Sequence, residues 1–108
     1  MKLIKLLLVM FIPIMGFTQI NVIHFNANWN SANDVKWVDD LENCKVKHID
    51  IATDTESQSK WEIVVVPTIL IINEGEEVKR YQADISFTMK ATFEEVQEKV
   101  NEIYGDDF

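Results

Sequence analysis

Few side chains in this sequence have the chemistry of a nucleophile or a metal ligand. There is one cysteine, Cys44, and there are two histidines, His24 and His48. A single cysteine cannot form an intramolecular disulfide. Cys44 lies near the end of a predicted helix, and we expect it to be a small buried hydrophobe rather than a reactive thiol.

The histidines raise the question of a metal site. His48 and Asp50 share one face of a predicted strand, and His24 lies on a neighbouring strand, so the three can approach one another. A third strong ligand at a recognisable spacing is missing, which favours structural polar residues over a metal site. No nucleophilic triad or glycine-rich phosphate loop is present either, and the sequence predicts neither metal nor cofactor.

Length and charge narrow the possible partners. The 108 residues suffice for one domain, and the 47% of hydrophobic residues indicate a packed core. Ten basic against eighteen acidic side chains give a formal charge of −8, which repels nucleic acid and anionic lipid surfaces. We therefore expect a protein or peptide partner rather than nucleic acid.

The first nineteen residues have the pattern of a signal peptide. Lys2 and Lys5 precede an apolar run that Pro13 interrupts, and small or polar residues follow up to Gln19. The run is shorter than the roughly twenty residues that a membrane span requires. This pattern predicts an exported protein, periplasmic or secreted, with a domain over 20–108. An uncleaved membrane anchor is the alternative interpretation.

Hydrophobic periodicity assigns the elements that must position these residues. β-branched and aromatic residues predict strands over 20–27 and 46–51, and a third strand that starts after Pro67 and pairs with 77–82 in a hairpin. Val35, Val38 and Leu41 recur at helical spacing after Asn30, a favourable N-cap residue. A short helix is predicted over 54–61, and a capping box, Thr92 to Glu95, starts the last helix.

The order of these elements predicts the fold class. Strand, helix, strand, helix, strand, strand, helix (βαβαββα) gives an α/β sandwich of three layers, in which helices flank a four-stranded mixed sheet. The first strand is expected to be central and the second to lie at an edge.

Three landmarks along 20–108 resemble the thioredoxin superfamily. The first strand leads into Trp29-Asn30-Ser31-Ala32-Asn33, which is similar to the segment where that family has Trp-Cys-Gly-Pro-Cys at a helix start. Val66-Pro67-Thr68 is similar to the family's cis-proline loop. The hairpin and the capped last helix follow in the family's order. The resemblance implies a thioredoxin-like fold with a cis-proline at Pro67.

The departures from that family concern its chemistry. Asn30 and Asn33 occupy the two cysteine positions, and an amide can neither attack a disulfide nor resolve a mixed disulfide. His24 stands where the resemblance implies a buried acidic residue. Gln82 replaces a glycine of the substrate groove, with Ala83 after it.

These residues favour a non-catalytic thioredoxin-like protein that binds a protein or peptide. The resemblance implies a groove formed by Trp29, Val66, Pro67 and Ala83. Alternatively, Pro67 only shapes a loop and Trp29 covers the core. Residual thiol activity at Cys44, or a role as an accessory subunit of a redox complex, is the remaining hypothesis.

Overall fold

The computed structural model describes residues 19–106. The predicted signal peptide lies outside these residues except for Gln19, so its interpretation stays a prediction. Within 19–106, none of the helices combines the length and the apolar character needed to cross a membrane.

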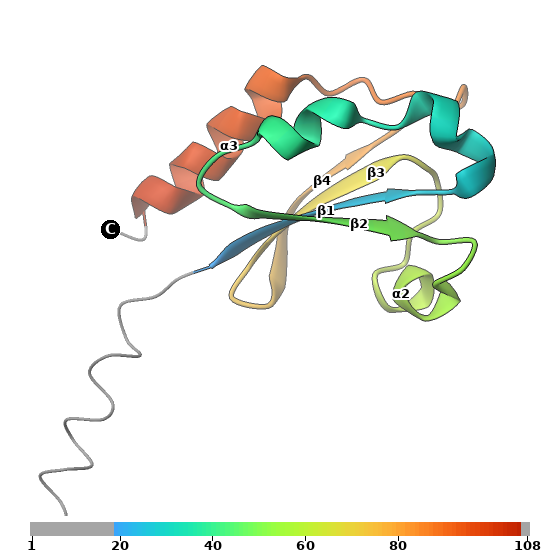
Figure 1. The fold of residues 1–108 in the computed structure, drawn as a ribbon. Coiled ribbons are helices and arrows are strands. Elements are labelled where there is room, and N and C mark those ends of the chain that lie inside the picture. Colours follow the sequence, from blue (N-terminus) through green and yellow to red (C-terminus); the bar gives the residue numbers. More distant parts are fainter. Residues whose placement is uncertain (1–18, 107–108) are drawn as a thin grey trace, which may run out of the picture.

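A four-stranded mixed sheet forms the centre of the molecule (Figure 1). β1 (Ile20–Asn26) pairs in parallel with β2 (Lys45–Asp50) and antiparallel with β3 (Thr68–Asn73). β3 pairs antiparallel with β4 (Glu76–Gln82), which gives the strand order β2-β1-β3-β4. The prediction of a central first strand and an edge second strand is confirmed.

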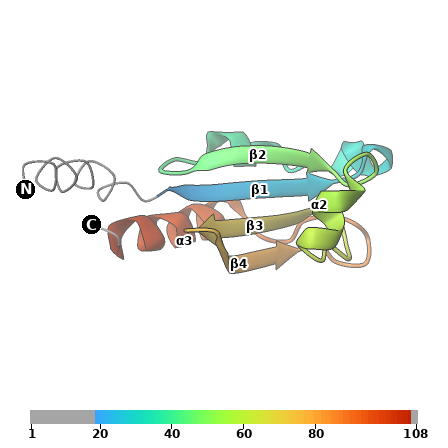
Figure 2. The ribbon, with the colours of Figure 1, turned by 90° about the horizontal axis from the view of Figure 1, so that it is seen from below.

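Successive side chains of each strand point to opposite faces of the sheet, and those on each face form one apolar cluster. On one face, Val22 of β1 and Ile69 of β3 pack under α3 (Phe93–Asp106) and the segment that follows β1. On the other face, Phe25 and Leu70 pack with Ile63 and Val66, near α2 (Thr55–Lys60). α2 and α3 lie on opposite faces of the sheet (Figure 2). The three-layer α/β sandwich is confirmed.

The segment after β1 differs from the prediction of one amphipathic helix. It forms two short 3₁₀ helices, η2 (Asn28–Asn33) and η3 (Lys36–Asp40), separated by extended backbone at Asp34 and Val35. The N-cap position of η2 is Ala27, and Asn30 lies inside the helix with non-helical dihedral angles. Asn30 therefore caps nothing. Its side chain bonds instead to Asn26, to Asn33 and to the distant carbonyl of Phe87, and such side-chain bonds override helical periodicity.

The remaining elements start where the sequence indicates. Asp54 caps α2, accepting a hydrogen bond from the backbone N–H of Ser57 at 3.0 Å. At α3, Thr92 Oγ1 accepts from the N–H of Glu95 at 3.2 Å, and Glu95 accepts in return from the N–H of Thr92 at 2.9 Å. The predicted capping box is confirmed. Its helix directs Val96, Val100 and Ile103 into the core, as the spacing indicates.

Candidate functional site

The two asparagines at the predicted redox positions are hydrogen-bonded to each other. η2 begins directly after β1, so Asn30 lies beyond the carboxyl end of the central strand, where only 6% of it is exposed. Its Nδ2 donates to Asn26 Oδ1 at 3.0 Å and to the carbonyl of Phe87 at 3.2 Å. Its Oδ1 accepts from Asn33 Nδ2 at 2.8 Å. We call Asn26, Asn30 and Asn33 the amide cluster.

Cys44 lies far from this cluster in the topology. It is in the bend before β2, not near the end of a helix as predicted. Because β1 and β2 are parallel, this bend is at the opposite end of the sheet from Asn30. Cys44 is partly buried against the apolar cluster under α3, and this burial raises the pKa of its thiol to about 11. The expected role as a small hydrophobe fits this position.

The structure brings together three residues of the predicted groove, Val66, Pro67 and Ala83, and places Trp29 against another partner. Val66 and Pro67 are buried and joined by a cis peptide bond, and the Pro67 carbonyl accepts from the N–H of Ala83 at 3.0 Å. Trp29 is 65% exposed and therefore does not cover the core. Its ring packs edge to face on Phe87, with the ring centroids 5.4 Å apart. A groove shared by all four residues stays a prediction.

The partner of Trp29 belongs to a loop, 83–89, whose role the sequence analysis missed. The carboxylate of Asp84 accepts from the N–H of Ser86 at 2.9 Å and from Thr88 Oγ1 at 3.3 Å. Hydrogen bonds from the Ser86 hydroxyl and the Ser86 N–H, together with that from Lys90, hold the pKa of Asp84 well below its usual range. The spacing of an aspartate with a serine two residues later indicates such a turn. That signal was readable in the sequence.

Loop 83–89 presents apolar side chains to solvent. Ile85 is 97% exposed and Phe87 is 42% exposed. Phe87 also has a φ of 63°, a left-handed conformation that is unfavourable for a bulky residue. Two hydrogen bonds hold the backbone of Phe87, one from Asn30 to its carbonyl and one from its N–H to the carbonyl of Asp84 at 3.0 Å. We call the three exposed side chains Trp29, Ile85 and Phe87 the Trp29 patch.

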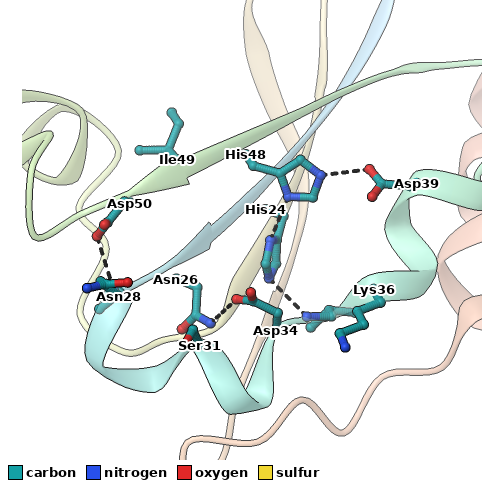
Figure 3. A pocket seen from close by; sticks show the side chains of 12 residues that line it. His24, Asn26, Asn28, Ser31, Asp34, Lys36, Asp39, His48, Ile49 and Asp50 are labelled. Carbon is teal, nitrogen blue, oxygen red and sulfur yellow. Dashed lines mark hydrogen bonds and ion pairs between the residues drawn. The ribbon is translucent and has the colours of Figure 1, made fainter.

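The two histidines form a hydrogen-bonded chain that reaches Asp39 of η3 (Figure 3). His24 is buried, as the resemblance implies for its position, and its Nε2 accepts from the N–H of Val35 at 3.2 Å. His24 Nδ1 lies 3.0 Å from His48 Nδ1, and His48 Nε2 lies 2.7 Å from Asp39 Oδ1. The sequence analysis considered Asp50 as the acidic neighbour of the histidines, and the structure places Asp39 there instead.

Only one arrangement of protons satisfies the histidine chain when both rings are neutral. Because the Val35 N–H occupies His24 Nε2, the proton of His24 must be on Nδ1, which donates to His48. His48 then carries its proton on Nε2 and donates to Asp39. Burial, reinforced by the neighbouring His48, lowers the pKa of His24 to about 4 and keeps the ring neutral at pH 7.

The same arrangement disfavours a metal ion between the rings. A metal bound at His24 Nδ1 would require the proton of His24 to move to Nε2, where it would face the Val35 N–H. Among residues 19–106 no group of three or more histidine, cysteine, aspartate or glutamate side chains is placed to hold a metal. The histidines are better explained as structural groups that fasten η3 to the sheet.

A cavity of about 430 Å³ lies beside the histidine chain. β1, β2 and the two 3₁₀ helices supply its lining, which combines apolar and charged groups. Figure 3 shows the polar side chains around it, with Asp34, Asp39 and Asp50 placed on different elements.

Comparison with solved structures assigns the fold. A thioredoxin variant from Halobacterium salinarum superposes with a TM-score of 0.63 at 16% identity, covering 78% of this chain and 74% of that one. A Schistosoma mansoni thioredoxin superposes with a TM-score of 0.61 at 19% identity, covering 78% of this chain and 76% of that one. Thioredoxin 1 from Thermosipho africanus superposes with a TM-score of 0.59 at 16% identity, covering 80% of this chain and 94% of that one.

The chain has the thioredoxin fold. No protein-family model matches the sequence, and neither does any curated protein. Identities below a fifth transfer the fold and not the activity. The function of this chain therefore depends on its own side chains, above all on Asn30 and Asn33 at the predicted redox positions.

The depressed pKa of His24 predicts a pH-dependent stability. The unfolded chain takes up a proton near the ordinary histidine pKa of 6.5, whereas the folded chain does so near 4. Between these values the unfolded state binds more protons, so stability is full above pH 6.5 and falls as the pH drops toward 4. The loss amounts to about 3 kcal/mol.

Chemical denaturation at intervals from pH 7.5 to 4.5 measures this loss. The variant His24→Gln lacks the titrating ring, and its unfolding free energy is expected to stay nearly constant over the same window. The exposed Lys47, on the neighbouring strand, provides a control in Lys47→Gln, which should retain the wild-type slope. An equal slope in wild type and His24→Gln would contradict the assignment.

Proposed function

We propose that this chain is a non-catalytic thioredoxin-like protein that binds a protein or peptide through the Trp29 patch. One observation carries the proposal. The side chains at both presumed redox positions are asparagines bound into the amide cluster, and this cluster supports an exposed aromatic patch directly beside it.

The Trp29 patch has the composition of a protein-binding surface. Tryptophan and other aromatic residues are enriched at interfaces because one side chain removes a large apolar area from water with few rotatable bonds. Leaving Ile85 almost fully exposed brings no benefit to an isolated domain. Val64, also exposed, belongs to the segment before β3 at the same end of the sheet, which extends the apolar character there.

The geometry of the patch suits recognition because it is held before a partner arrives. Asp84 organises loop 83–89, and Asn30 fixes the carbonyl of Phe87. A surface that is ordered in advance loses less conformational entropy on binding. The left-handed Phe87 is a further reason, since unfavourable backbone conformations concentrate at functional sites.

The predicted groove contributes to this proposal only in part. Val66 and Pro67 are buried and leave little surface for a ligand, so the partner is expected to rest on Trp29 and on loop 83–89, which begins at Ala83. Export by a signal peptide over residues 1–19 is part of the same proposal. A partner would then be met in the periplasm or outside the cell.

Selection of peptides from a displayed library on the purified protein tests the role of Trp29. Selected peptides are expected to lose about tenfold or more in affinity for Trp29→Ala, equivalent to about 1.4 kcal/mol, because the aromatic face supplies the largest apolar contact. Val78→Ala is the matched control, an exposed apolar side chain near the amino end of β4. Binding that is insensitive to Trp29→Ala, or that changes equally in both variants, would count against the proposal.

Absence of thiol chemistry is the second expectation. With a pKa of about 11 for Cys44, roughly one thiol in ten thousand is ionised at pH 7, and only the thiolate attacks disulfides. In an insulin-reduction assay, wild type and Cys44→Ser are expected to match the rate without protein. Activity in the wild type that Cys44→Ser abolishes would instead establish a single-cysteine redox protein.

A further inference from the structure

The cavity beside the histidine chain has an apolar floor and an acidic rim. Ala27, Val35 and Ile49 contribute buried apolar side chains to its lining. The carboxylates of Asp34, Asp39 and Asp50 and the ammonium group of Lys36 are the charged groups around it. The rim of the cavity therefore carries three negative charges and one positive charge.

Each of the three carboxylates has one oxygen already engaged inside the protein. Asp39 Oδ1 bonds to His48, and Asp50 Oδ1 accepts from the N–H of Ala52 at 2.9 Å and from the N–H of Asn28 at 3.3 Å. Asp34 Oδ1 accepts from the side chain of Asn26. Within 19–106 the Oδ2 atoms of these three residues have no hydrogen-bond partner. The inner oxygens fix the carboxylates in place, and the outer oxygens remain available.

We propose that this cavity receives a lysine or arginine side chain of the bound partner. The aliphatic part of such a side chain fits over Val35 and Ile49, and its charged group reaches the free carboxylate oxygens at the rim. The inference rests on the proposed function, because it names the chemistry of the partner that the Trp29 patch would bind.

Other ligand classes fit the cavity less well. The carboxylates repel phosphates and other anions, and the closed histidine chain leaves no ring nitrogen for a metal. A neutral apolar ligand would leave the charged rim without compensation. The formal charge of −8 on the whole chain also attracts a basic partner over longer distances.

The cavity and the Trp29 patch flank the same short helix. Asn28 and Ser31 of η2 line the cavity, whereas Trp29 of the same helix contacts Phe87 in loop 83–89. An extended segment that crosses η2 can therefore place an apolar side chain on Trp29 and a basic side chain in the cavity. The partner motif this arrangement indicates is an apolar residue close to a lysine or arginine.

Titration of the purified protein with small probes, followed by ¹H–¹⁵N spectra at pH 7.5, tests the cavity alone. The probes are N-acetyl-arginine amide, N-acetyl-lysine amide and, as the neutral match for arginine, N-acetyl-citrulline amide. The charged probes are expected to shift the amide signals of Asn28, Ile49 and Asp50 in a saturable way, with dissociation constants on the order of millimolar. Citrulline is expected to produce no saturable shift.

Substitutions at the rim identify the groups responsible. Asp39→Asn and Asp50→Asn remove the charge but keep an oxygen for the internal hydrogen bonds, and each is expected to weaken arginine binding by about two- to fivefold. Asp40→Asn is the matched control, because Asp40 is an exposed neighbour on η3 that does not line the cavity. A higher salt concentration should also weaken arginine binding, because salt screens the attraction between the probe and the carboxylates.

Three results would each overturn the cavity assignment. The citrulline probe could shift the amide signals as much as the arginine probe, the arginine probe could give no saturable shift, or Asp40→Asn could weaken arginine binding as much as the rim variants Asp39→Asn and Asp50→Asn. Trp29→Ala is expected to leave binding of the arginine probe unchanged, which separates this test from that of the proposed function. If the arginine probe does not bind but peptides still bind in a Trp29-dependent way, only the proposal that the cavity receives a basic side chain is refuted. If the arginine probe binds but peptide binding does not depend on Trp29, the Trp29 patch is refuted as the partner site and the cavity is retained as a cation site.

Discussion

The side-chain amide of Asn30 is the interaction on which the arrangement of this site depends. Both of its Nδ2 protons and its Oδ1 are used, so a buried polar group is satisfied entirely within the protein. Leaving such a group without partners would cost about 1–3 kcal/mol. These bonds join the end of β1, the helix η2 and loop 83–89. Asn30, which the sequence analysis predicts at a redox position, thus holds together the elements that present Trp29.

A second set of bonds holds the same segment from its other side. The histidine chain connects Val35, between the two 3₁₀ helices, to the central strand and then through the edge strand to Asp39 of η3. Short 3₁₀ helices have few internal bonds and rely on such anchors. The amide cluster and the histidine chain fix η2 between the apolar Trp29 patch and the acidic cavity. The two surfaces differ chemically and lie close together, as the proposed partner requires.

Local sequence patterns predicted the framework well and the polar contacts poorly. The strands, the hairpin after Pro67 and the box from Thr92 to Glu95 depend on neighbours in the sequence, and all are confirmed. The prediction of one helix after Asn30 was wrong, because the bond from Asn30 to Phe87 connects distant parts of the chain and outweighs periodicity. The contact of Asp39 with His48 follows from the break between η2 and η3, so it could not be predicted either.

The hydrogen exchange of the Asn30 side-chain amide, measured by NMR at neutral pH, tests the central claim most directly. The account predicts two resolved Nδ2 proton signals that exchange with solvent far more slowly than those of the exposed Asn28. It also predicts nuclear Overhauser contacts from these protons to Phe87, across loop 83–89. Exchange as fast as that of Asn28, with no contact to Phe87, would show that the amide cluster does not hold the site together.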